Sequence, residues 1–83
     1  MSTHITKKNV EGTFAVFCKM IGKEVGQAPG QWYLDTYLGY CVEEVLPSGG
    51  VRQPFGSTRR NTSEMFYTLH FALNLLDWRA GDA

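Results

Sequence analysis

The segment from Asn61 to Arg79 constrains the fold of this chain most, because it reads as one helix with two apolar faces. At about 100° per residue, one set of side chains forms a wide stripe: Met65, Phe66, Leu69, Ala72, Leu73 and Leu76. A second set extends that stripe around the helix: Tyr67, Phe71, Leu75 and Trp78. A surface helix needs an apolar stripe little wider than about 100°. We therefore expect the first set to form the core, with Phe66 and Leu73 at its margin. The second set must contact either the sheet of this chain or another molecule.

The composition indicates one small domain, residues 1–83, with a thin core. Eight Lys and Arg residues balance eight Asp and Glu residues, so the whole chain has no net charge to attract a polyanion. The polar N-terminus does not resemble a signal peptide, and no apolar run reaches the roughly 18 residues of a membrane span. We expect a soluble intracellular protein.

The N-terminal part of the chain predicts an amphipathic helix from Lys7 to Lys23. Thr6 is expected to be its N-cap, because the turn that follows is polar and apolar residues flank the cap at the staple positions. The apolar stripe of this helix contains Val10, Phe14, Phe17, Cys18 and Ile21. Gly12 weakens the helix interior by up to about 1 kcal/mol, whereas Gly22 or Gly26 can supply the left-handed residue that ends it.

The middle of the chain is rich in aromatic and β-branched residues and predicts three strands, at Trp32–Thr36, Gly39–Leu46 and Gly50–Phe55. The turn at residues 47–50 contains a proline and two glycines, which favours an antiparallel hairpin. The break between the first two strands is weaker, so one long bent strand plus a partner is the alternative. Pro54 cannot donate a ladder hydrogen bond, and this places the third strand at an edge.

Asn61 and Glu64 form a pair typical of a capping box and predict the start of the last helix, with Gly81 just beyond its end. The predicted order is therefore α-β-β-β-α. This order is typical of an α+β fold, in which a small three-stranded antiparallel sheet carries both helices on one face. We expect the other face of the sheet to be open.

No catalytic residue, metal ion or cofactor is predicted. Cys41, His70 and Asp77 supply the residue types of a thiol nucleophile, a base and an orienting acid, but no spacing in the sequence brings them together. The carboxylates Asp35, Glu43 and Glu44 are expected to be solvated, and adjacent strand residues point to opposite faces. The sequence contains neither metal-ligand spacing nor a phosphate-binding glycine motif.

The two cysteines, Cys18 and Cys41, are too few for a disulfide framework. We expect both to be buried free thiols. A disulfide between them is the alternative, provided that the first helix packs beside the second strand.

Arg52, Arg59 and Arg60 are candidates for contact with an anion or a nucleic acid, because two of them precede a helix N-terminus. Tyrosines on the sheet could add stacking surfaces for single-stranded nucleic acid: Tyr33, Tyr37 or Tyr40. In the alternative interpretation, the tyrosine rings cover the sheet edges. The arginines then pair with carboxylates: Glu43, Glu44 or Glu64.

Several short strings carry a resemblance to a known group of proteins: Trp32-Tyr33-Leu34-Asp35, Tyr37-Leu38-Gly39-Tyr40, Gly49-Gly50-Val51, Pro54-Phe55-Gly56, and Arg60 before Glu64-Met65-Phe66. Over residues 6–78 the chain resembles small proteins of tailed phages and prophages that have no assigned activity. Those proteins tend to have a second glycine where this chain has Leu38. The resemblance implies an accessory protein of a mobile element, located in the cytoplasm of a bacterial host. Such proteins often bind a host or defence component stoichiometrically, including as anti-CRISPR proteins.

Two functions follow as expectations. The first is a non-catalytic protein that inhibits or redirects a host or defence protein, with the second apolar set of the last helix as its binding residues: Tyr67, Phe71, Leu75 and Trp78. The same residues could instead form a homodimer. The alternative function is a small nucleic-acid-binding or regulatory module that uses the three arginines and the sheet tyrosines.

Overall fold

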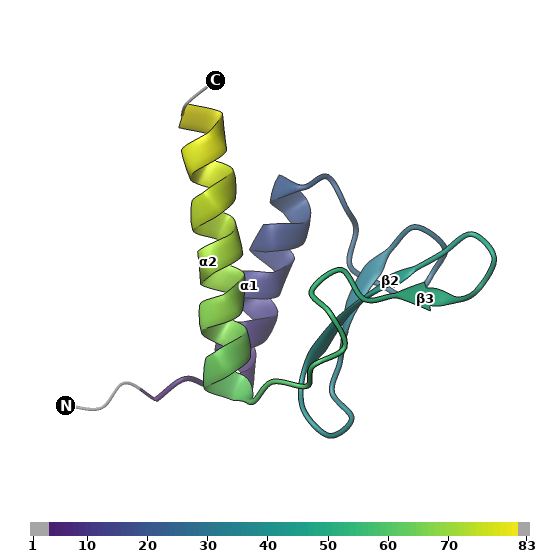
Figure 1. Ribbon diagram of the computed structural model, residues 1–83, viewed down its shortest axis with the longest axis horizontal. Helices are drawn as coiled ribbons and strands as arrows, with labels where there is room; N and C mark the ends of the chain where they lie inside the picture. Colours follow the sequence, from purple (N-terminus) through teal and green to yellow (C-terminus); the bar gives the residue numbers. More distant parts are fainter. Residues whose placement is uncertain (1–3, 82–83) are drawn as a thin grey trace.

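The computed structural model describes residues 4–81 of the chain and contains two helices and one three-stranded sheet (Figure 1). In chain order the elements are α1 (Lys7–Met20), β1 (Trp32–Asp35), β2 (Cys41–Val45), β3 (Val51–Arg52) and α2 (Thr62–Gly81). The predicted α+β class and the order α-β-β-β-α are confirmed.

Helix α1 begins where the sequence predicts. Thr6 is its N-cap: the backbone N–H of Asn9 donates to Thr6 Oγ1 (3.2 Å), and the backbone N–H of Thr6 donates to Asn9 Oδ1 (2.9 Å). The helix ends at Met20, three residues before the predicted end. Gly22 follows with a left-handed φ of +74°, so the first of the two glycines considered supplies the stop.

The three strands pair antiparallel in the order β1-β2-β3, which confirms three separate strands over one long bent strand. The first turn is made by two residues with positive φ, Leu38 (+56°) and Gly39 (+108°). A leucine is strained in this conformation, whereas a glycine is not.

Strand β3 is shorter than predicted and ends before Pro54, although it occupies the edge of the sheet as expected. The chain after β3 returns along β2, where Tyr40 and Arg60 exchange two backbone hydrogen bonds of 2.8 and 3.0 Å. Gly39 permits this close approach, because a Cβ atom there would lie 3.2 Å from the carbonyl oxygen of Arg60.

The two helices lie side by side and run in the same direction, with the sheet to one side of the pair (Figure 1). Helix α1 is central, since it packs against both β1 and α2, whereas α2 packs chiefly against α1. The core contains Val10, Phe14, Phe17, Cys18, Trp32, Val42, Met65 and Leu69. Met65 and Leu69 are fully buried, while Ala72 and Leu76 are only half-buried against this cluster.

Helix α2 begins with the predicted capping box. The backbone N–H of Asn61 donates to Glu64 Oε1 (2.9 Å), and the backbone N–H of Glu64 donates to Asn61 Oδ1 (2.8 Å). The helix continues through Gly81, two residues past its predicted end at Arg79. Within residues 4–81, neither helix combines the length and the apolar character needed to cross a lipid bilayer.

Candidate partner-binding surface

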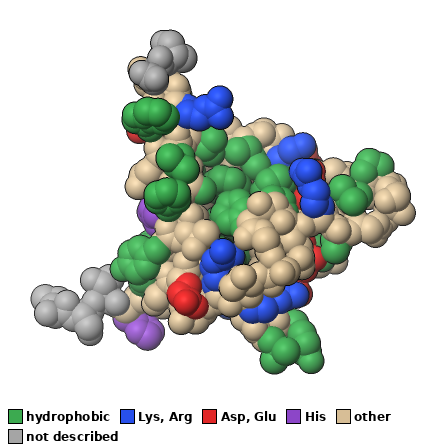
Figure 2. Space-filling model, in the orientation of Figure 1, with side chains coloured by type: hydrophobic (Ala, Val, Ile, Leu, Met, Phe, Trp, Pro, Cys, Tyr) green, Lys and Arg blue, Asp and Glu red, His purple; other side chains and the backbone are tan. Residues whose placement is uncertain are grey.

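The second apolar set of α2 lies on the surface of the molecule. The exposed fractions are 61% for Tyr67, 65% for Phe71, 47% for Leu75 and 66% for Trp78. We call these four residues the outer row. Figure 2 shows hydrophobic side chains projecting at intervals along the α2 edge of the molecule. Neither α1 nor the sheet therefore covers the outer row.

The position of the outer row follows from the geometry of α2. At about 100° per residue, the outer row lies opposite the centre of the stripe that contains Met65 and Leu69. Helix α1 covers that inner stripe, and this places the outer row on the side of α2 that faces away from the rest of the chain. A helix with apolar residues on both sides is normally buried on both sides.

The outer row contains no charged residue, and charged side chains lie only near its two ends. Glu64 lies on the same face one turn before Tyr67, and Arg79 follows Trp78. Between these ends, the exposed residue Asn74 lies beside the row. His70 is also exposed and lies further around the helix. An apolar centre with charges at its rim is the usual arrangement of a protein interface.

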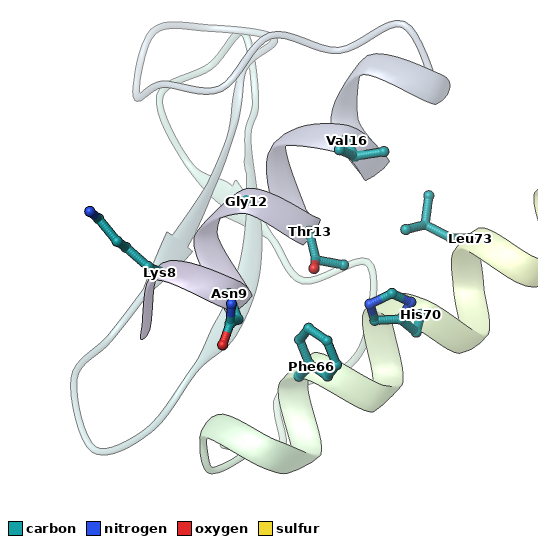
Figure 3. A pocket seen from close by; sticks show the side chains of 8 residues that line it. All are labelled: Lys8, Asn9, Gly12, Thr13, Val16, Phe66, His70 and Leu73. Carbon is teal, nitrogen blue, oxygen red and sulfur yellow. The ribbon is translucent and has the colours of Figure 1, made fainter. Parts of the chain in front are cut away.

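A second exposed apolar area is a shallow groove of about 380 Å³ between α1 and α2. Thr13 and Val16 of α1 line it opposite Phe66, His70 and Leu73 of α2 (Figure 3). The rings of Phe66 and His70 are in contact, with centroids 4.4 Å apart.

The α1 side of this groove was not among the predicted contact residues. The sequence does contain a signal for this side. Gly12, Val16 and Met20 are spaced four residues apart, on a face of α1 that is separate from its buried stripe. Val16 and Met20 are both about half exposed.

Two of the three candidate arginines are held by carboxylates. Arg52 donates to Glu44 Oε1 through both Nη2 (2.6 Å) and Nε (2.9 Å). Arg59 forms an ion pair with Asp35, and this hydrogen bond raises the pKa of the Arg59 guanidinium. Pairing with Glu44 was one of the predicted alternatives, whereas Asp35 was not among the predicted partners.

Arg60 is placed differently from the other two arginines. Its backbone pairs with Tyr40, and its side chain reaches the carbonyl oxygen of Phe55 at 3.5 Å. The three arginines are thus engaged separately, with two carboxylates and one backbone carbonyl. The sheet tyrosines are not equivalent either, since Tyr37 is exposed in a turn while Tyr40 packs against the core.

The expectation that Glu43 is solvated is wrong, because only 6% of its surface is exposed. Glu43 lies on the central strand of the sheet, and Tyr33 of β1 lies directly opposite it. Burial, and then the charge of Glu43, raises the pKa of the Tyr33 hydroxyl. Glu44, the adjacent residue, faces the other side of the sheet and pairs with Arg52, as the alternation of strand residues predicts.

Both cysteines are free and buried in the structure. Burial raises the pKa of the Cys18 thiol from 9.0 to about 11 and also raises the pKa of the Cys41 thiol. A reactive cysteine needs a lowered pKa instead.

The structure does not join the residues considered for catalysis. The thiol of Cys41 donates to the carbonyl oxygen of Gly56 at 3.5 Å, whereas His70 lies on α2 against Phe66. Asp77 lies exposed on α2, two helical turns beyond His70. Across residues 4–81, no group of three or more His, Cys, Asp or Glu side chains is placed to hold a metal ion.

Comparisons with protein-family models, curated proteins and solved structures found no match to this chain.

Proposed function

We propose that this chain is a non-catalytic accessory protein that acts by binding another protein through the outer row of α2. The observation that carries this proposal is the exposure of four large apolar side chains in line on one helix face. Tyr67, Phe71 and Trp78 are aromatic, and rigid aromatic side chains contribute most of the binding energy at many interfaces.

The outer row has the arrangement of a helical binding face. Its members are spaced by four, four and three residues, so together they follow one side of α2 for about 17 Å. A partner that lies along this side would remove three aromatic rings and one leucine from water. The row contains no charge that would have to be desolvated.

The resemblance to small phage and prophage proteins supports a particular class of target. We propose that the partner is a host or defence protein in the bacterial cytoplasm, which this chain inhibits or redirects in the manner of an anti-CRISPR protein. A second copy of the chain is the other partner that the outer row could bind.

Affinity capture from a host lysate, with prey identified by mass spectrometry, tests this function. The bait variant is Tyr67→Ala combined with Phe71→Ala. The control is Tyr37→Ala, which removes an aromatic ring that is somewhat more exposed from the β1–β2 turn. We expect the wild type and the control to retain a common prey that the double variant loses. A prey that binds all three baits equally would show that the outer row is not the interface.

The nucleic-acid function is the weaker alternative, because Arg52 and Arg59 are already neutralised by Glu44 and Asp35. A mobility-shift assay at low salt with single-stranded and duplex probes tests it directly. We expect no shift with either probe. A shift that disappears steeply with added salt, and that requires Arg60, would favour nucleic acid instead.

A further inference from the structure

We propose that the outer row of α2 binds the outer row of a second copy, so that two antiparallel α2 helices form a symmetric dimer in the absence of another partner. This inference rests on one premise of the proposed function, that the outer row is a contact surface. In this arrangement a target protein competes with the second copy for the same residues.

The spacing of the outer row suits antiparallel self-pairing. The row is centred between residues 72 and 73, so a two-fold axis at that point places Tyr67 of one copy opposite Trp78 of the other. Phe71 and Leu75 of both copies then surround the axis. Each aromatic ring at an end keeps its polar atom near the rim, where water can reach it.

The charges at the ends of the row are complementary in this arrangement. Viewed along the axis of α2, Glu64 and Arg79 lie on the same side of the centre of the outer row. Their angular distances from that centre are about 25° and 85°. The two-fold axis of an antiparallel pair is perpendicular to the helices. It therefore places the same side of the outer row from each copy next to the other. Glu64 of one copy and Arg79 of the other then lie about 3 Å apart along the helix axis, which long side chains can span.

The capping role of Glu64 is compatible with this ion pair. Its Oε1 atom accepts the hydrogen bond from Asn61 N–H, and a carboxylate has a second oxygen that can accept from a guanidinium. In a parallel pair, by contrast, Glu64 of one copy and Arg79 of the other would lie about 22 Å apart along the helix axis and could not pair. The charge pattern therefore favours the antiparallel pair.

The available area indicates a weak dimer. With about 100–150 Å² exposed on each aromatic ring, the outer row offers about 400–500 Å² per copy. With its flanking residues, the pair approaches the total of about 1,200 Å² at which specific interfaces begin. We therefore expect a dissociation constant of about 1–100 µM.

The other elements of the chain, α1 and the sheet, leave this face of α2 uncovered. Helix α1 and the sheet lie on the inner side of α2, so the outer face stands at the edge of the molecule (Figure 1). Antiparallel pairing also opposes the dipoles of the two α2 helices, whereas α1 and α2 run in the same direction within one copy.

Sedimentation over a series of protein concentrations tests the dimer. We expect the average mass of the wild type to rise from 9.3 kDa toward twice that value as the concentration crosses the micromolar range. Phe71→Ala should raise the dissociation constant at least tenfold, and Tyr37→Ala should leave it unchanged. A wild type that stays monomeric to 1 mM overturns the proposal, as does an equal effect of the two substitutions.

A double-mutant cycle at Glu64 and Arg79 tests the orientation of the two helices in the dimer. Arg79→Glu should weaken the wild-type dimer about fivefold, because Glu64 of the other copy would then face a like charge. Glu64→Gln removes that charge and keeps a capping side chain. In the Glu64→Gln background, Arg79→Glu should have an effect of less than twofold. Equal effects in both backgrounds would overturn the antiparallel arrangement.

The two proposals fail in different experiments. A monomeric wild type that still captures a prey through Tyr67 and Phe71 would remove the dimer and leave the binding function. A dimer that captures no prey dependent on these residues would remove the inhibitory function and leave the dimer.

Discussion

The two faces of α2 have similar composition and opposite environments. The inner face places Met65 and Leu69 in the core, where both are fully buried. The outer face carries Phe71 and Trp78, which expose about two thirds of their surface. What distinguishes the two faces is the position of α1, which covers one side of α2 only.

This difference teaches that an apolar face indicates burial without indicating what buries it. Only one side of α2 contributes to the core. It is the side that contacts α1 and the core residues of the sheet. The other side contributes nothing to the core of a single chain. Substitutions on the inner face should therefore change the stability of the chain, whereas those on the outer face should change its association.

The largest expected effect is on the inner face. Leu69→Ala should lower the free energy of unfolding by about 2–5 kcal/mol, because it removes a fully buried side chain and leaves a cavity. Urea unfolding followed by circular dichroism measures this loss. A loss below 0.5 kcal/mol would mean that the inner face is not the packed face of α2.

Alkaline pH should also act on the inner side, through Cys18 of α1. The folded chain holds the pKa of Cys18 at about 11, whereas an unfolded thiol keeps the ordinary value of 9.0. Between these two values the unfolded chain binds fewer protons, so the free energy of unfolding should fall by up to about 1.4 kcal/mol per pH unit. Below pH 9 this contribution is fully present and independent of pH.

Urea unfolding of the wild type and Cys18→Ala, at a series of pH values from 8 to 11, measures this effect. The wild type should lose stability more steeply above pH 9 than the variant does. Cys41 and Tyr33 also have raised pKa values and supply the slope that remains in the variant. Parallel curves for the two proteins would contradict the assignment to Cys18.

A smaller effect of opposite sign is expected on the exposed side of α1. A Cβ atom at Gly12 would meet no atom within 4 Å, so Gly12→Ala should stabilise the helix through its backbone propensity alone. The expected gain in unfolding free energy is about 0.5–1 kcal/mol. Thermal unfolding of the two proteins, followed by circular dichroism, should show a higher midpoint for the variant. A lower midpoint would indicate a contact at Gly12 that the structure lacks.

The smallest effect on stability is expected on the outer face. Phe71→Ala should change the unfolding free energy of the monomer by less than about 0.5 kcal/mol, because the ring is 65% exposed. The measurement must be made well below the dissociation constant of the dimer, where self-association adds no stability. A loss comparable to that of Leu69→Ala would remove the distinction between the two faces.

Much of the fold could be predicted because local signals and periodicity agreed. Thr6 and the pair of Asn61 with Glu64 start the two helices, and their side-chain and backbone hydrogen bonds depend only on neighbouring residues. The strand ends were less predictable. Strand β3 is short because its pairing depends on how the chain after Arg52 turns back along β2, which local sequence does not specify.

The candidate surface could be predicted only as a choice between two outcomes. The spacing of Tyr67, Phe71, Leu75 and Trp78 defines a face, but periodicity does not say whether the sheet covers it. Glu43 illustrates the same limit for a residue that was expected to be exposed. A glutamate on a strand is usually solvated, whereas this one is buried. Exposure is a property of the assembled elements, and it required the structure.

The parallel arrangement of α1 and α2 has a consequence for synthesis of the chain. Phe14 and Met65 belong to one core but are separated by 51 positions in the sequence, and the whole sheet lies between them. At a translation rate of about 5–20 residues per second, Phe14 is made roughly 3–10 s before Met65. During that interval the apolar stripe of α1 has no second helix to cover it. Helix α2 therefore covers α1 only after the whole sheet has been made.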